Sequence, residues 1–124
     1  MTQHVDFLVE KYYKSRYFEN TIILTHLNGI SIICLNIKDS NNTLKCVEFV
    51  NTILSNSNKN GILKEKVKIQ IGEPICKVIF SDNSEEIIYS NISGELVEVN
   101  FNVTNSYERC RSSSWVGILS NTKH

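Results

Sequence analysis

Pairs of carboxylates that could act as general acid and base occur at two places in the sequence. Glu85 and Glu86 are adjacent in a stretch that favours a β-strand, so their side chains would point to opposite faces and could not share one substrate. Glu73 and Glu95 stand at equivalent positions of two similar segments, and we expect both to orient turns. The serines at 112–114 lack the pattern of a nucleophile elbow. The sequence therefore predicts a protein that is not an enzyme.

Cysteine and histidine residues are too widely spaced to predict a metal site. The cysteines form no Cys-x-x-Cys pair, and His26 has no second histidine nearby. Structural zinc sites need ligand pairs at short spacing. We expect His26 to be a structural residue at the end of a strand. We expect three cysteines in apolar runs to be buried thiols, namely Cys34, Cys46 and Cys76, whereas Cys110 lies in a polar connector.

Residues 72–100 contain the most informative pattern, because a Gly-Glu turn followed by strand-forming residues occurs twice, at 72–78 and 94–100. Between the two copies, the polar residues 81–86 are flanked by the apolar runs 78–80 and 87–89. Asp and Asn accept left-handed backbone at little steric cost, so this arrangement predicts a β-hairpin.

The order of these segments resembles the glycine-cleavage H-protein and the biotinyl and lipoyl carriers, whose hairpin tip displays one lysine that receives lipoate or biotin. The resemblance implies a mainly β fold, the barrel-sandwich hybrid. It puts the acceptor position on Asn83, at the tip Asp82, Asn83, Ser84. A carboxamide cannot be acylated as an amine can, and the nearest lysine in the sequence, Lys77, falls in the leading strand. We therefore expect a carrier scaffold without carrier chemistry.

Shorter segments resemble the Abitram (Simiate) family, which is itself related to the H-protein and lacks its lysine. They are residues 8–14, 19–26, 75–77 and 81–83, and the resemblance extends from about Leu8 to Leu119. It implies a non-catalytic interaction domain without a cofactor, which binds actin, modulates transcription and resides in the nucleus and the cytoplasm.

The 124 residues suffice for one domain with its own core. Alanine is absent, which favours strands over helices. The exception is an amphipathic helix predicted at the N-terminus, residues 1–19, packed on a single domain of residues 20–124. Its surplus aromatic and basic side chains form a candidate partner-binding face: Tyr12, Tyr13, Lys14, Arg16 and Tyr17. Alternatively, the helix only packs across the barrel.

Period-two patterns and turn residues predict the other elements. Residues 21–26 and 30–35 form a hairpin around Asn28 and Gly29, residues 44–53 a third strand, and residues 56–61 a solvated turn. Trp115 begins a closing strand and is expected in the core. Along residues 63–71 alternation brings three lysines to one face: Lys64, Lys66 and Lys68. They indicate either an edge strand protected against association or a basic strip for an acidic protein partner.

The formal net charge is zero, which gives no reason to predict binding to nucleic acid or to an anionic membrane. No signal peptide is evident, so we expect a reducing cytosolic or nuclear setting. The sequence thus predicts a protein-interaction domain with a protein partner, for which actin is the candidate. The alternatives are an H-protein-like carrier with lipoate on Lys77 or another lysine, and a scaffold that binds a lipoyl-like ligand non-covalently beside the hairpin.

Overall fold

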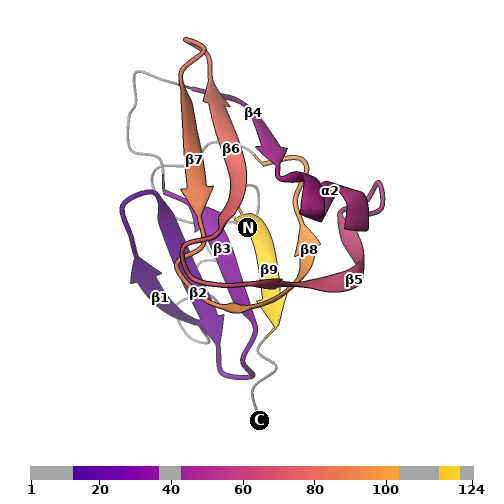
Figure 1. Ribbon diagram of the computed structural model, residues 1–124. Coiled ribbons are helices and arrows are strands. Elements are labelled where there is room, and N and C mark those ends of the chain that lie inside the picture. The colour runs from indigo at the N-terminus through magenta and orange to yellow at the C-terminus, as the bar shows by residue number, and fades with distance from the viewer. Residues whose placement is uncertain (1–12, 37–42, 104–114, 121–124) are drawn as a thin grey trace, which may run out of the picture.

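The computed structural model describes residues 13–36, 43–103 and 115–120, which form two antiparallel β-sheets and one short helix (Figure 1). The six-stranded sheet has the order β1-β2-β3-β9-β8-β5, and the three-stranded sheet has the order β4-β6-β7. The prediction of a mainly β fold is confirmed. The elements are β1 (Tyr13–Tyr17), β2 (Thr21–His26), β3 (Ser31–Leu35), β4 (Leu44–Phe49), α2 (Asn51–Asn56), β5 (Ile62–Ile69), β6 (Pro74–Phe80), β7 (Glu85–Tyr89), β8 (Gly94–Val99) and β9 (Trp115–Ser120).

The hairpin predicted around Asn28 and Gly29 is present as β2 and β3. Its register runs from the pair Thr21 and Leu35 to the pair Thr25 and Ser31. Gly29 has a φ of 95°, which L side chains rarely adopt. The Asn28 side chain accepts a hydrogen bond from the backbone nitrogen of Ile30 at 3.1 Å. The predicted hairpin is confirmed, but its turn is not of type I′, because Asn28 does not have a positive φ and contributes a side-chain hydrogen bond instead.

The predicted N-terminal helix is wrong for residues 13–17, which form strand β1; residues 1–12 lie outside the described residues. β1 pairs with β2 along its whole length, from Tyr13 opposite His26 to Tyr17 opposite Ile22. The sequence of this segment is compatible with either element. Its tyrosines favour a β-strand, whereas the spacing of the apolar residues in the N-terminal region favours an α-helix. Pairing with the adjacent β2 decides in favour of the strand.

The predicted third strand ends early. β4 stops at Phe49, and residues 51–56 form helix α2, so the predicted strand is wrong for residues 51–53. The backbone nitrogen of Leu54 donates to the carbonyl of Val50 at 3.0 Å, and Ile53 becomes completely buried. A short amphipathic turn leaves too little periodicity to be recognised, and burial of Ile53 is what favours it.

The main core lies between the two sheets and takes residues from both. It includes Ile23 and Ile33 of the six-stranded sheet and Val78 and Ile88 of the three-stranded sheet, all with no exposed surface. Strand β9 runs between β3 and β8, in the middle of the larger sheet. Trp115 is only half-buried and packs instead on a second cluster formed by Ile22, Leu24 and Cys34. The predicted burial of Trp115 in the core is therefore confirmed only in part, because the side chain packs on this second cluster and remains half-exposed.

The three cysteines predicted as buried thiols have three different environments. Cys76 is buried, as predicted, and burial raises the pKa of its thiol from 9.0 to about 12. Cys46 is an exposed thiol, because it lies on the outer face of β4. Cys34 is buried but disulfide-bonded, so it is not a free thiol. Cys110 lies outside the described residues.

Candidate functional site

The hairpin of β6 and β7 projects beyond the six-stranded sheet, with its tip at the top of Figure 1. Asn83 lies at this tip with a φ of 69°, the only positive value among the described residues other than glycine. Its backbone nitrogen donates to the carbonyl of Phe80 at 2.8 Å. The Asp82 carboxylate accepts hydrogen bonds from the backbone nitrogen and the hydroxyl of Ser84, at 2.9 and 2.6 Å. The predicted hairpin and its tip are confirmed.

A lysine from the neighbouring strand reaches the tip. The Nζ atom of Lys45, in β4, donates to Oδ1 of Asn83 at 3.3 Å. The backbone nitrogen of Ser81 also donates to the carbonyl of Thr43 at 2.9 Å, which ties the base of the tip to the start of β4. Sequence reasoning missed Lys45, because its proximity to Asn83 depends on the pairing of β4 with β6, which no local pattern encodes.

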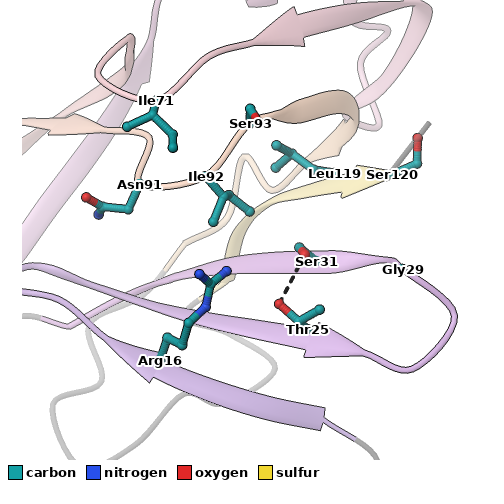
Figure 2. A pocket seen from close by; sticks show the side chains of 10 residues that line it. All are labelled: Arg16, Thr25, Gly29, Ser31, Ile71, Asn91, Ile92, Ser93, Leu119 and Ser120. Carbon is teal, nitrogen blue, oxygen red and sulfur yellow. Dashed lines mark hydrogen bonds between the residues drawn. The ribbon is translucent and has the colours of Figure 1, made fainter. Parts of the chain in front are cut away.

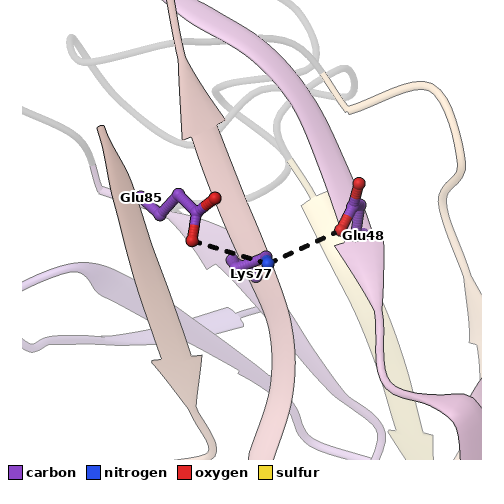
Figure 3. A network of polar contacts seen from close by, with 3 residues as sticks. All are labelled: Glu48, Lys77 and Glu85. Carbon is purple, nitrogen blue, oxygen red and sulfur yellow. Dashed lines mark ion pairs between the residues drawn. The ribbon is translucent and has the colours of Figure 1, made fainter. Parts of the chain in front are cut away.

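Lys77, by contrast, lies in the middle of β6. Its Nζ atom is 3.5 Å from a carboxylate oxygen of Glu85 and 3.8 Å from one of Glu48, one glutamate on each neighbouring strand (Figure 3). All three side chains are substantially exposed, so each ion pair contributes little to stability. The arrangement is a cross-strand charge cluster on the outer face of the smaller sheet and lies away from the tip.

The clearest grouping of like charges is on β5, an edge strand of the six-stranded sheet. Its three lysines are exposed along one face, while Leu63 and Ile69 are buried on the other. We call these side chains the lysine row: Lys64, Lys66 and Lys68. Of these three lysines, only Lys66 makes an ion pair with a described residue, and its Nζ atom lies 3.9 Å from a carboxylate oxygen of Glu95. The predicted alternation and the predicted edge position are both confirmed.

The aromatic and basic candidates near the N-terminus do not share one face. Strand alternation puts Lys14 and Arg16 on one face of β1 and Tyr17, which is 69% exposed, on the other. Tyr12 lies outside the described residues, and Tyr13 is the first residue of β1. β1 and the lysine row are at opposite ends of the strand order. The predicted helical face is therefore replaced by two sides of an edge strand.

Comparison with known proteins finds no matching family model, no matching curated protein and no matching solved structure. Within residues 13–36, 43–103 and 115–120, no group of three or more His, Cys, Asp or Glu side chains is placed to hold a metal ion. None of the helices in this part of the chain is long and apolar enough to cross a membrane.

Proposed function

We propose that this chain is a non-catalytic protein-interaction domain that binds an acidic surface of a partner protein through the lysine row. The observation that carries the proposal is the exposure of three lysines in line on the edge strand β5. Lys64 and Lys68 make no ion pair with any described residue, so their charges remain available to a partner. Complementary charge raises association rates and selects partners more than it raises affinity.

The same lysines also protect the edge strand from pairing with another sheet. These two roles differ in what they require. Protection needs a charge of either sign at each position, whereas binding to an acidic partner needs a positive charge. Replacing lysine by glutamate therefore preserves protection and removes binding.

Actin is the partner that we propose, and the support for it is the resemblance to the Abitram family. The same resemblance supports a barrel-sandwich hybrid as the finer description of the fold, with nuclear and cytoplasmic residence and a role in modulating transcription. Two sheets that enclose one core, with a projecting hairpin, are compatible with that architecture.

Cosedimentation with actin filaments tests the proposal. The double variant Lys64→Glu, Lys68→Glu should bind roughly tenfold more weakly at low salt, which corresponds to about 1.4 kcal/mol. Binding of the native protein should fall as salt is raised, because the charges are exposed. The control variant Lys14→Glu, Lys45→Glu changes the net charge equally on other strands and should bind as the native protein does. Equal binding by the lysine-row variant, or no binding by the native protein, would reject the proposal.

A lipoyl carrier is the second candidate, because an amine, that of Lys45, lies within hydrogen-bonding distance of the hairpin tip. Intact-mass spectrometry of protein purified from its natural source, and of protein incubated with lipoate and a lipoate ligase, separates the two candidates. An interaction domain gives one unmodified mass in both samples. A mass increase that peptide mapping assigns to Lys45 or Lys77 would favour the carrier.

A further inference from the structure

A cavity of about 360 Å³ lies between the two edges of the six-stranded sheet (Figure 2). Arg16 of β1 lines it from one edge, and Ile71, just after β5, lines it from the other. The remaining walls come from β2, β3, the end of β9 and the β7–β8 connection, and none comes from the tip at residues 81–84. The volume is in the range of small-molecule sites.

The only formal charge that lines the cavity is positive. Arg16 is the only charged residue among those that line it, and no described acidic side chain pairs with Arg16. Figure 2 shows the guanidinium extending from β1 toward Ile92. A guanidinium offers a planar fork of donors that matches the oxygens of a carboxylate or a phosphate.

Two hydroxyls, those of Thr25 on β2 and Ser31 on β3, also line the cavity. Oγ1 of Thr25 and Oγ of Ser31 are 3.2 Å apart, so one donates to the other and the acceptor keeps a proton to offer a ligand. The hydroxyl of Ser120 is buried and has no hydrogen-bond partner within the described part of the chain. Leu119 is paired with Ser31, so strand alternation turns the Ser120 side chain to the other face of β9, and the anion site uses only the hydroxyls of Thr25 and Ser31.

The opposite wall combines the apolar residues Ile71 and Ile92 with the polar residues Asn91 and Ser93. Ile92 and Leu119 are buried against the core, whereas Ile71 remains 69% exposed at the rim of the cavity. A short hydrocarbon chain would cover this exposed surface. We infer that the cavity binds a small organic anion, with its carboxylate or phosphate on Arg16 and the two hydroxyls and its short apolar body against Ile71 and Ile92. The lysine row has no part in this site.

A titration followed by amide ¹H–¹⁵N NMR spectra of the full chain tests this inference with four probes. Hexanoate should cause saturable shifts at the residues lining the cavity. Hexanamide has the same shape without the charge and should bind at least tenfold more weakly. Inorganic phosphate should also bind more weakly than hexanoate, because it lacks the apolar body. A phosphate monoester with a six-carbon chain, tested in parallel, distinguishes the two head groups.

Two variants complete the experiment. Arg16→Gln should weaken hexanoate binding at least tenfold, and Lys14→Gln should leave it unchanged, because Lys14 has the same charge on the same face of β1 but does not line the cavity. If Arg16→Gln fails to fold, the comparison of hexanoate with hexanamide on the native protein still tests whether the cavity binds an anion. The inference is overturned by any of three results: no saturable shifts at the lining residues with either anion, equal binding of hexanoate and hexanamide, or equal binding by a folded Arg16→Gln variant. Phosphate that binds as tightly as hexanoate overturns the role of the apolar wall.

Discussion

Lys45 donates from its Nζ atom to Oδ1 of Asn83 at 3.3 Å, so a lysine of β4 contacts the apex of the hairpin formed by β6 and β7. Asn83 has no amine of its own, and its left-handed backbone, with φ of 69°, needs a residue that tolerates this conformation. The conformation of the tip thus depends on the backbone of Asn83, and the hydrogen bond from Lys45 is an exposed contact.

The free energy of unfolding should depend more on the backbone conformation at the hairpin tip than on the hydrogen bond between Lys45 and Asn83. Asn83→Ala should lower the free energy of unfolding by about 1 kcal/mol, because alanine is disfavoured at positive φ. Asn83→Gly should change it by less than about 0.5 kcal/mol, and so should Lys45→Met, which removes only an exposed hydrogen bond. Urea denaturation measures all three. A larger loss with Lys45→Met than with Asn83→Ala would mean that the side-chain contact dominates.

Gly61 and Gly72 form a matched pair for separating backbone strain from crowding. Both have positive φ, 88° and 94°. A Cβ atom at Gly61 would lie 2.1 Å from the carbonyl oxygen of Val99, whereas one at Gly72 would meet nothing within 4 Å. Gly72→Ala should therefore cost about 1–2 kcal/mol from strain alone. Gly61→Ala should cost several kcal/mol or prevent folding. Equal losses in chemical denaturation would contradict the close approach of Gly61 to β8.

The thiols of Cys46 and Cys76 should differ sharply in reactivity. Cys46 is exposed, and Cys76 is buried with its pKa raised to about 12. At pH 8 a thiol reagent should modify Cys46 in the folded protein and reach Cys76 only after unfolding, because the thiolate is the reactive form. Peptide mass mapping before and after addition of urea identifies the modified residue. Rapid labelling of Cys76 without urea would contradict its burial.

Burial of Cys76 also makes stability depend on pH in the alkaline range. The folded thiol keeps its proton to a higher pH than the unfolded thiol, so unfolding releases a proton between pH 9 and 12. The contribution of the Cys76 thiol to the free energy of unfolding is constant below pH 9. As pH rises from 9 to 12, the free energy of unfolding falls. The difference between native protein and Cys76→Ala should therefore shrink between pH 8 and pH 10.5. A constant difference would mean that the thiol titrates normally in the folded chain.

The hydroxyl of Ser120 should be dispensable for folding. Because it is buried without a hydrogen-bond partner in the described residues, Ser120→Ala should raise the free energy of unfolding by about 1 kcal/mol. Thr21→Val is the contrasting variant, because the Thr21 hydroxyl accepts a hydrogen bond from Asn91 at 2.8 Å, and it should be destabilising. A loss of stability with Ser120→Ala would mean that this hydroxyl has a partner.

The sequence by itself determined the features that depend on near neighbours. Alternation along residues 62–69 was enough to orient the lysine row, and the residues Asn28, Gly29 and Asn83 were enough to locate two turns. These patterns are readable because a strand has a fixed side-chain period of two and because few residues accept positive φ.

Only the tertiary structure decided which strands pair and what the pairing brings together. It made residues 13–17 a strand by pairing them with β2 and inserted β9 between β3 and β8. It also brought Lys45 to Asn83 and placed Arg16 and Ile71 on two sides of one cavity. Periodicity tells which face of an element is apolar but not which other element will cover it. That choice depends on the apolar area buried by the whole chain, to which residues far apart in the sequence contribute together.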